Sequence, residues 1–492
     1  MRIRVLSRAS DLATLQARLV AAALRARWPS LDVTLATQSS EGDRDRRIAL
    51  WDATEKGLFT TDLSQALVDR RADVVVHSWK DLPIEPHPGT AIAATIERAD
   101  ARDVLLVRRD VVDARPGALT ILTSSPRRMW QIERALAPLL PWSVATIGTT
   151  AVRGNIPTRL AKLVAGEGHG LIVAKAALDR LLSPAATPAI ARAVRAAIDE
   201  CRWMVLPLRE FPTAPAQGAL AVEIAADAGD VRDAVSAIDH APTHHAVDEE
   251  RRILADAGGG CHEAIGASVR VRDYGVVTSV RGRMPGGEER EVWSLRLQGD
   301  AWPRVDEAAI WPRRDERDRG ARRPSADARV PADAAGLWIA RAEALPAAFV
   351  PGRSQIVWVA GSRTWEKLAG RGIWVHGGAE GLGDGEAPNV DVLASHPTNW
   401  LRVTHADSGD PDAVATYAVE HALPDDLEQR THFFWTSGSL FLRALERFPA
   451  IRTQRHASGP GRTSRVIRET LGPSSGARVW LDYDQWLQSV IR

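Results

Sequence analysis

Short apolar runs without polar alternation, each followed by a helix-like pattern, constrain the fold of the first 220 residues more than any other feature. Val74-Val75-Val76 is one such run, and residues 171–174 form another. Runs of this kind are typical of strands buried on both faces of a mainly parallel sheet. Because parallel strands need a crossover, usually a helix, the alternation predicts an α/β fold with ligand-binding loops at the carboxyl ends of its strands.

Local signals place the first helices. Ser10 precedes leucines at positions 12, 15 and 19, which would share one helix face. Ser125 before Pro126 is typical of a helix start, since serine caps the first turn and proline suits its first position.

The remaining chain divides by composition. From residue 267 three strand-like segments (267–271, 276–283 and 291–297) predict a small α+β domain. Residues 303–334 are rich in Arg, Asp, Ala and Pro, which predicts a linker. Folded patterning resumes at 335, and 492 residues are too many for one core.

Charge and cysteine content exclude several functions. A net charge of +1 favours neither nucleic acid nor an anionic membrane as a partner, and no apolar run approaches 18 residues. Two cysteines and the absence of a signal-peptide pattern predict a cytoplasmic protein without a disulfide framework. No Walker A loop, dinucleotide fingerprint, nucleophile elbow or zinc-ligand spacing occurs.

Lys80 and Asp81 are adjacent just after a buried strand, in residues 77–83. This is where open α/β sheets gather their ligands, and the cation would help to keep the carboxylate ionised. The alternative is a solvated loop with neighbouring opposite charges.

Arg127 and Arg128 occupy the first turn of the helix that Pro126 opens. There they oppose the helix dipole by about 0.3–1 kcal/mol each. We therefore expect them to bind ligand carboxylates and not to serve folding; two exposed arginines on a surface turn are the alternative.

Further cations follow predicted strands or precede helices. Arg153 lies in a Gly-containing loop and Arg159 opens the next helix, although a polar connection would look the same. Arg8 with Ser10, and Lys56 with Phe59, have similar positions.

Cys261 follows three glycines, Gly258-Gly259-Gly260, which would let a loop present its thiol in a crowded place. A buried, inert cysteine is the alternative, and we interpret Cys201 in that way.

In their order and separations these motifs resemble the porphobilinogen deaminase (hydroxymethylbilane synthase) family over about residues 1–300. The matching stretches are residues 7–10, 55–59, 76–83, 123–128, 152–160, 216–220 and 258–261. The chain differs from the family's pattern at residues 53–55 and at Pro215-Ala216, where glycines are usual, and at Trp79, where a smaller apolar residue is usual.

The resemblance implies two lobes like those of type II periplasmic binding proteins, a small α+β cofactor domain and a C-terminal α/β region. The first lobe would comprise residues 1–98 and 216–240, the second 103–212, and the cofactor domain 245–300. A linker at 303–334 and a C-terminal region at 335–492 would follow.

The resemblance also implies a transferase of heme biosynthesis that joins four porphobilinogen units into hydroxymethylbilane and releases ammonia. A dipyrromethane cofactor on Cys261 would prime the chain, and Asp81 would be the catalytic carboxylate. Cofactor binding would involve Ser78, Lys80, Ser125, Arg127 and Arg128; substrate binding would involve Arg8, Ser10, Lys56, Phe59, Arg153, Asn155, Arg159 and Gln217. The implied partners are porphobilinogen and polypyrrole intermediates, with no metal, nucleic acid or membrane, and we expect a monomer.

Two segments beyond residue 335 are similar to each other. Residues 356–378 and 433–461 each read as strand, Ser/Thr turn, helix, strand and Gly-rich turn, a pattern similar to uroporphyrinogen-III synthase, although the region is short. Its hypothetical activity is closure of hydroxymethylbilane, with Thr436, Ser437 and Ser439 as hydrogen-bond donors; an inactive structural or docking module is the alternative. For the whole chain, the alternative is a two-lobe solute-binding protein, which would not need the Gly-Cys loop.

Overall fold

The computed structural model describes residues 1–492 except 39–60, 259–263, 318–320, 326–328, 332, 409 and 421. The chain forms two compact units. The first comprises Met1–Ala137, Ser143–Val271 and Thr278–Trp293; the second comprises Pro138–Trp142, Arg272–Val277 and Ser294–Arg492.

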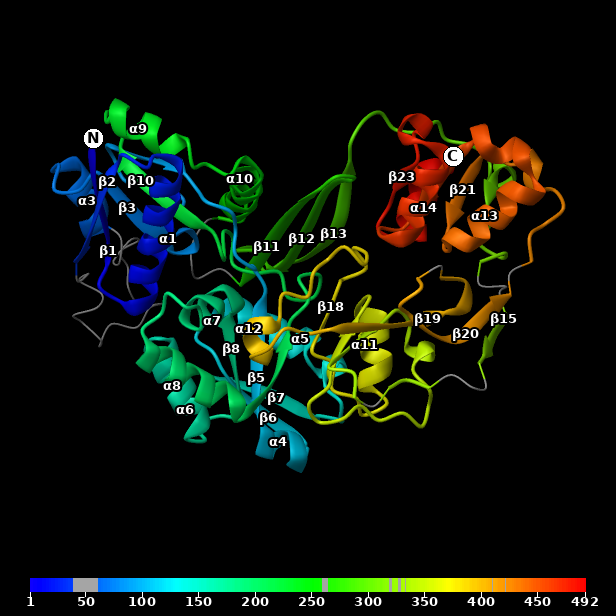
Figure 1. Ribbon diagram of the computed structural model, residues 1–492, viewed down its shortest axis with the longest axis horizontal. Coiled ribbons are helices and arrows are strands. Elements are labelled where there is room, and N and C mark those ends of the chain that lie inside the picture. Colours follow the sequence, from blue (N-terminus) through cyan, green and yellow to red (C-terminus); the bar gives the residue numbers. More distant parts are fainter. Residues whose placement is uncertain are drawn as a thin grey trace. The chain divides into compact units, whose positions relative to one another are not determined.

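The first sheet of the first unit has the strand order β2-β1-β3-β10-β4, and Figure 1 labels β1, β2, β3 and β10. Strand β1 pairs in parallel with β2 and β3, while β10 is antiparallel to both β3 and β4. Its core includes Val5, Leu24 and Val222, each with no exposed surface. The elements are β1 (Arg2–Arg8), α1 (Asp11–Arg27), β2 (Asp32–Gln38), α3 (Thr61–Val68), β3 (Val74–Ser78), η1 (Trp79–Asp81), β4 (Thr90–Ala94), β10 (Leu220–Ala225) and α9 (Gly229–Ser236).

The second sheet has the order β7-β6-β8-β5-β9. Strand β6 is parallel to β7 and β8, and β5 is antiparallel to β8 and β9. Its elements are β5 (Asp103–Arg108), α4 (Arg109–Ala114), β6 (Ala118–Leu122), α5 (Pro126–Ala135), η2 (Ala137–Leu139), β7 (Thr146–Thr150), α6 (Ile156–Val164), β8 (Gly170–Ala174), α7 (Lys175–Leu181), α8 (Pro188–Asp199) and β9 (Cys201–Val205).

The two sheets share one topology. In each, three parallel strands are followed by the antiparallel strand that the chain enters when it crosses from the other sheet: β5 after residues 95–102 and β10 after residues 206–219. This is the strand order of type II periplasmic-binding-protein lobes, so the predicted fold class is confirmed.

A third sheet, β11-β12-β13, follows helix α10. Its elements are α10 (Ala241–Asp256), β11 (Ile265–Arg272), β12 (Gly275–Arg283) and β13 (Glu289–Leu297). Ile265, Ala267 and Val280 are buried against Ile253 and Leu254 of the helix. One helix on one face of an antiparallel sheet is the α+β arrangement expected for this region.

A single carboxylate on α10 joins these three parts. Glu250 is fully buried and accepts hydrogen bonds from both Nη atoms of Arg98, at 2.7 and 2.9 Å. It also accepts from the backbone nitrogens of Ala216, at 2.7 Å, and Val269, at 2.8 Å. Arg98 and Ala216 lie in the two crossings and Val269 lies in β11. The lobes and the third sheet therefore share one hydrogen-bonded centre.

The second unit contains a six-stranded and a four-stranded sheet, ordered β15-β20-β19-β16-β17-β18 and β14-β21-β22-β23. All neighbouring strands are parallel except β15 and β20. The elements are η3 (Glu307–Ala309), β14 (Ile310–Trp311), β15 (Ala321–Pro324), β16 (Gly336–Ile339), η4 (Ala342–Ala344), β17 (Ile356–Val359), α11 (Ser362–Ala369), β18 (Gly377–Gly378), α12 (Asp391–Ala394), β19 (Trp400–His405), η5 (Ala406–Ser408), β20 (Val414–Glu420), η6 (Leu427–Gln429), β21 (His432–Trp435), α13 (Gly438–Arg447), η7 (Pro449–Thr453), β22 (Arg455–Ser458), α14 (Arg462–Leu471), η8 (Pro473–Ser475), β23 (Arg478–Val479) and α15 (Tyr483–Val490).

The predicted linker, residues 303–334, contains short strands in the structure. Ile310 and Trp311 are buried, and they form β14 at the edge of the four-stranded sheet, next to β21. Two apolar residues are enough for a short edge strand, but the surrounding Arg and Asp hide them in any compositional window. The predicted domain boundaries, those of the linker included, stay predictions.

Aromatic packing accounts for part of the high tryptophan content. In the core of the four-stranded sheet the ring centroids of Trp311 and Trp435 are 4.7 Å apart, and Phe433 stacks on Trp435 at 5.5 Å. Trp435 also donates its indole N–H to Nδ1 of His456 at 3.0 Å. Because the strands are short, a few large aromatic side chains fill the core between them.

Candidate active site

Trp79 fixes the loop that carries Lys80 and Asp81. The residues form the short helix η1 directly after β3. Trp79 is 3% exposed, packs with Ala216 and Val247, and meets the ring of His244 edge-on at 5.3 Å. The family that the chain resembles usually has a smaller side chain at this position. The larger Trp79 therefore packs against the crossing segment, residues 206–219. Asp81 remains exposed, while Lys80 is half-buried.

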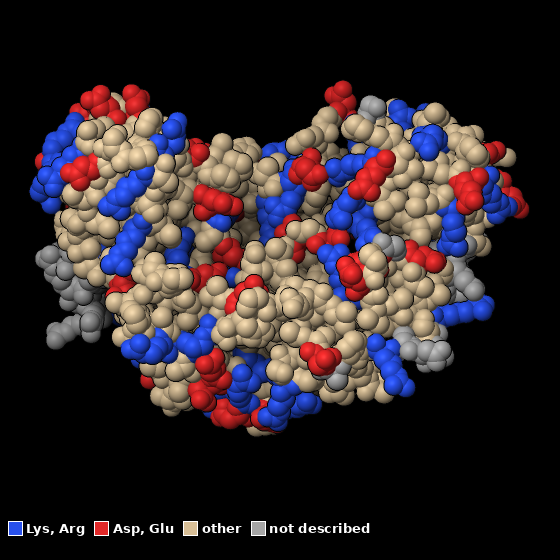
Figure 2. All heavy atoms as spheres, in the orientation of Figure 1, with Lys and Arg blue, Asp and Glu red and all other residues tan. Residues whose placement is uncertain are grey.

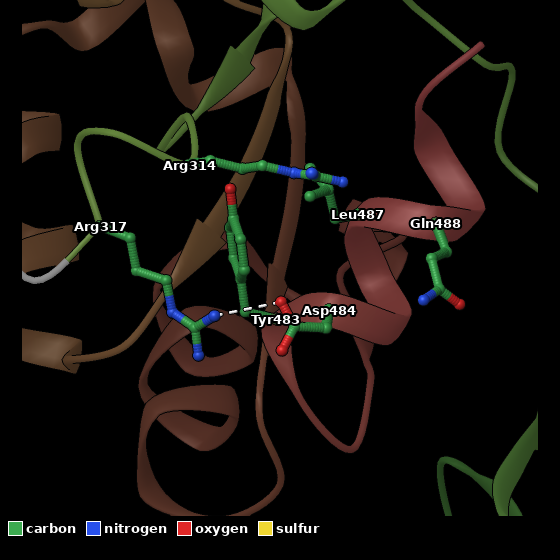
Figure 3. A pocket seen from close by; sticks show the side chains of 6 residues that line it. All are labelled: Arg314, Arg317, Tyr483, Asp484, Leu487 and Gln488. Carbon is green, nitrogen blue, oxygen red and sulfur yellow. Dashed lines mark hydrogen bonds and ion pairs between the residues drawn. The ribbon is translucent and has the colours of Figure 1, made fainter.

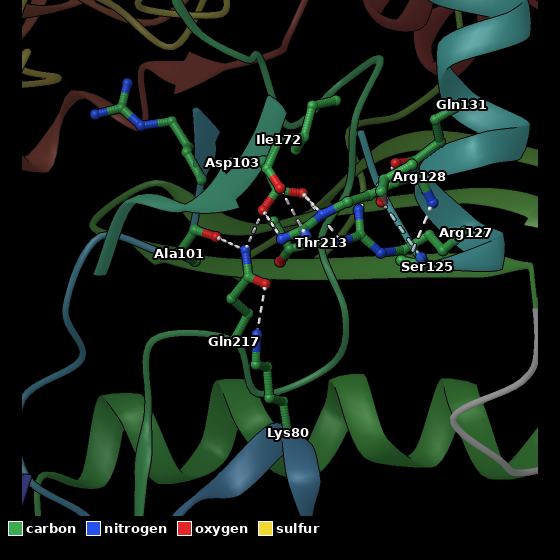
Figure 4. A network of polar contacts seen from close by, with 12 residues as sticks. Lys80, Ala101, Asp103, Ser125, Arg127, Arg128, Gln131, Ile172, Thr213 and Gln217 are labelled. Atoms are coloured by element: carbon green, nitrogen blue, oxygen red, sulfur yellow. Dashed lines mark hydrogen bonds and ion pairs between the residues drawn. The ribbon is translucent and has the colours of Figure 1, made fainter. Parts of the chain in front are cut away.

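Lys80 reaches the second lobe through a glutamine. Its Nζ donates to Oε1 of Gln217 at 3.3 Å. Gln217 in turn donates to the carbonyl of Ala101 at 2.7 Å and to Oδ1 of Asp103 at 2.8 Å (Figure 4). Gln217, a predicted substrate-binding residue, thus links the lobes at the crossing.

Asp103 is the centre of this network, and sequence reasoning missed it. Arg128 donates to its carboxylate through Nε at 3.1 Å and Nη2 at 2.7 Å, and Arg127 through Nη2 at 3.0 Å (Figure 4). Burial disfavours the charged form, but the two arginines outweigh it and hold the pKa of Asp103 well below its ordinary value. The carboxylate is therefore ionised and fully paired.

The expectation that Arg127 and Arg128 do not serve folding is corrected. Both are buried, at 4% and 9% exposure, and Arg128 also donates to the Ile172 carbonyl at 3.1 Å. Arg127 donates to the Pro212 carbonyl at 3.0 Å. The helix-dipole conflict is offset by an internal carboxylate 24 and 25 residues away, which no local pattern reveals.

The site holds more positive charge than its carboxylates neutralise. Burial lowers the pKa of Lys80, and Arg128 adds to this effect while Asp81 opposes it. Burial, with Arg128 nearby, lowers the pKa of Arg159 in the same way. Within the described part of the chain, neither Lys80 nor Arg159 forms an ion pair. Crowded cations of this kind favour an anionic ligand.

Several predicted ligand-binding side chains already cap helices. The hydroxyl of Ser10 accepts from Ala13 at 3.3 Å, and that of Ser125 accepts from Arg128 at 3.5 Å. Asn155 accepts from the nitrogen of Thr158 at 3.0 Å. These contacts orient the first turns of α1, α5 and α6, and any ligand contact comes in addition.

Ser78 is held by a residue that sequence reasoning did not select. Gln16 of α1 is 3% exposed, and its Nε2 donates to the Ser78 hydroxyl at 2.8 Å. Arg8 is half-buried at the end of β1, and Arg153 is exposed after β7. Lys56, Phe59 and Cys261 lie outside the described residues.

Two further observations concern surface charge and a cavity of the second unit. Figure 2 shows acidic and basic side chains intermixed over the visible face. A cavity of about 370 Å³ in the second unit is walled by Arg317, which lies 4.7 Å from the Tyr483 ring centroid and pairs with Asp484 at 3.1 Å (Figure 3). Its remaining lining residues are Arg314, Leu487 and Gln488.

Two negative observations apply to the part of the chain that the structure describes. No group of three His, Cys, Asp or Glu side chains there is arranged to hold a metal ion. No helix there is long and apolar enough to cross a membrane.

Comparison with known proteins agrees with the motif order. The family model "Porphobilinogen deaminase, dipyromethane cofactor binding domain" matches residues 3–233. The porphobilinogen deaminase of Leifsonia xyli subsp. xyli is 35% identical over 62% of this chain and 88% of that protein. The porphobilinogen deaminase of Nostoc sp. is 34% identical over 57% of this chain and 83% of that protein.

A solved TRAP periplasmic solute binding protein from Rhodobacter sphaeroides covers 52% of this chain and 80% of its own, with 10% identity and a TM-score of 0.28. The lobe topology rests on the strand order of the two sheets. The deaminase relatives disfavour the solute-binding interpretation. Since the chain spans more than four fifths of these deaminases at over 30% identity, it belongs to the porphobilinogen deaminase family.

Proposed function

We propose that the first unit is a hydroxymethylbilane synthase in which Asp81 is the catalytic carboxylate. The observation that carries this proposal is the position of Asp81, exposed beside the half-buried cations Lys80 and Arg159 where the two lobes are linked. Porphobilinogen carries two carboxylates and one amino group, so its binding requires cations for the first and an acid near the second.

The residues fit a dipyrromethane cofactor. Its acetate and propionate groups require several cations in a partly buried place, and Lys80 with Arg159 and the Arg128 region offer surplus positive charge there. We propose that Cys261 holds it through a thioether, with Ser78, Lys80, Ser125, Arg127 and Arg128 near its side chains. When bound, the cofactor supplies the free pyrrole carbon to which the first substrate carbon is joined.

Asp81 would act on protons and developing charge. The bond between the substrate's aminomethyl carbon and its nitrogen breaks, and the nitrogen leaves with its protons as ammonia. Asp81 would hold the proton on that nitrogen and stabilise the positive charge that develops on the pyrrole nitrogen. A new carbon–carbon bond then forms, and the ionised carboxylate takes up the displaced ring proton. Arg8, Arg153 and Arg159 would orient the substrate carboxylates, with Ser10, Asn155, Gln217, Lys56 and Phe59.

Two measurements test this function. Asp81→Asn keeps the side-chain shape and removes the charge, so turnover of porphobilinogen should fall about 10²-fold or more. Intact mass should exceed the sequence mass by two pyrrole units, and Cys261→Ser should abolish the increment. An Asp81→Asn enzyme with normal turnover, or an active protein without added mass, contradicts the proposal. We also propose a cytoplasmic monomer, which light scattering of the purified chain tests for oligomeric state.

We propose uroporphyrinogen-III synthase activity for the second unit. The chain leaves the four-stranded sheet at β14, forms the six-stranded sheet and returns at β21, so two α/β halves are joined by the antiparallel segments β15 and β20. The Ser437 hydroxyl caps α13 and lies 2.8 Å from that of Ser439, where they and Thr436 could meet a carboxylate.

The full-length chain supplied with porphobilinogen should yield isomer III of uroporphyrinogen. Isomer I alone, formed by spontaneous closure, would leave the second unit as a structural or docking module. Truncation at residue 334 is not a clean test, because it removes β21, the partner strand of the buried β14.

A further inference from the structure

Five charged side chains connect the two halves of the second unit. Asp384 follows β18, Arg402 lies in β19 and Asp410 precedes β20, so all three belong to the six-stranded half. Arg462 and Arg465 lie in the first two turns of α14, the helix drawn in red in Figure 1, which follows β22 of the four-stranded half.

The five residues form one continuous ion-pair network. Asp384 binds Nη1 of Arg402 at 3.0 Å and Nη2 of Arg465 at 3.1 Å. Asp410 binds the same Arg402 nitrogen at 3.4 Å and Nη1 of Arg462 at 3.2 Å. Each acid therefore bridges a cation of one half to a cation of the other.

Burial differs between the two signs of charge. The side chains of Asp384 and Asp410 are 9% and 14% exposed, whereas Arg402, Arg462 and Arg465 are 37%, 35% and 54% exposed. The arginines cover the acids and keep part of their own surface towards solvent. A ligand can therefore approach the cations, while the acids are enclosed.

The network lies where the carboxyl ends of both sheets meet. Gly383 after β18 and Gly461 after β22 approach so closely that a Cβ on Gly383 would lie 2.6 Å from the Gly461 Cα, and both have positive φ. His405 ends β19, and burial lowers its pKa, with Arg341 and Arg462 adding to the effect. The carboxyl edge of a parallel sheet is the usual ligand side of such folds, and here two such edges face each other.

We propose that Arg402, Arg462 and Arg465 form a carboxylate-binding site of the second unit, which Asp384 and Asp410 occupy until a polycarboxylate ligand replaces them. The existing geometry sets the ligand class: two carboxylates share one guanidinium, as an acetate and a propionate on one pyrrole ring could. The inference rests on the synthase activity proposed above, whose substrate carries eight carboxylates. In the absence of ligand, the ion pairs of Asp384 and Asp410 would hold the six-stranded and four-stranded halves together.

The test uses the full-length chain and uroporphyrin III, a stable octacarboxylate, titrated by fluorescence anisotropy. Arg462→Gln with Arg465→Gln should weaken binding about tenfold, since two charge-assisted contacts are lost. Asp384→Asn should strengthen binding about two- to fivefold, because an internal competitor is removed. Arg447 is an exposed arginine of α13 that pairs with Asp425. Arg447→Gln is therefore the control, and this variant should bind uroporphyrin III like wild type.

Opposite effects on uroporphyrin III affinity in the double arginine variant and in Asp384→Asn distinguish a ligand site from a structural ion pair. If Asp384→Asn weakens binding or leaves it unchanged, the competitor role is refuted. If the double arginine variant binds like wild type, the site itself is refuted. Porphobilinogen turnover by the first unit is measured for each variant and should stay normal, which reports that this unit is folded. Wild-type chain that yields only isomer I would refute the synthase activity, while the binding titration still decides the site.

Discussion

Replacing Arg128 by Met should loosen the second lobe of the first unit. Arg128 supplies two of the four hydrogen bonds described above for the buried carboxylate of Asp103; Arg127 and Gln217 supply the others. Breaking one partner of a buried pair costs about 3–5 kcal/mol when the other charge is left uncompensated. Because Arg127 remains on the same carboxylate, the charge is only partly uncompensated, and we expect a smaller loss of about 2–4 kcal/mol.

Hydrogen exchange measured by mass spectrometry suits this chain, since two units need not unfold in one transition. Peptides covering β5 and α5 should exchange about 30- to 1000-fold faster, because each 1.4 kcal/mol corresponds to a factor of ten. Arg192→Met, an exposed arginine on α8 of the same lobe, is the matched control and should change exchange little. Lost turnover with wild-type protection of β5 would refute the structural role of Arg128.

The sign of the pH dependence follows from the same carboxylate. The pKa of Asp103 is lower in the folded than in the unfolded chain, where it is about 3.9. Its contribution to stability is therefore complete above the unfolded pKa and is lost as pH falls towards the folded value. Protection of β5 should decline below about pH 4, and Asp103→Asn should remove that part of the decline. An unchanged acid profile in Asp103→Asn would contradict the linkage.

Three smaller predictions concern single backbone or polar contacts. Ala216 has φ of +65°, so Ala216→Gly should stabilise the first unit by about 0.5 kcal/mol, whereas the neighbouring Ala219→Gly should not; urea unfolding measures both. Glu250→Gln should destabilise it by about 3 kcal/mol, because a buried Arg98 loses its counter-charge, and unaltered exchange in α10 would contradict this. Ser437→Ala should loosen the start of α13 by about 1 kcal/mol, with the isomer ratio as an independent readout of any ligand contact.

Local features of the fold were readable in the sequence. The run Val74–Val76 and residues 171–174 became buried strands of the two lobe sheets, because a strand covered on both faces needs no polar alternation. Ser125 and Pro126 open α5 as predicted, because capping depends on residues within one turn. The ordered motifs similarly predicted the family and placed Asp81 and Lys80 after a strand.

Charge pairing was decided by the tertiary structure. Asp103 meets Arg127 and Arg128 only because β5 runs back beside β8, and Glu250 meets Arg98 across 152 residues of chain. Hydrophobic periodicity and capping are set by neighbours in the chain, so the sequence determines them by itself. The partner of a buried charge depends on which strands become adjacent, and only the folded chain brings the two groups out of water together.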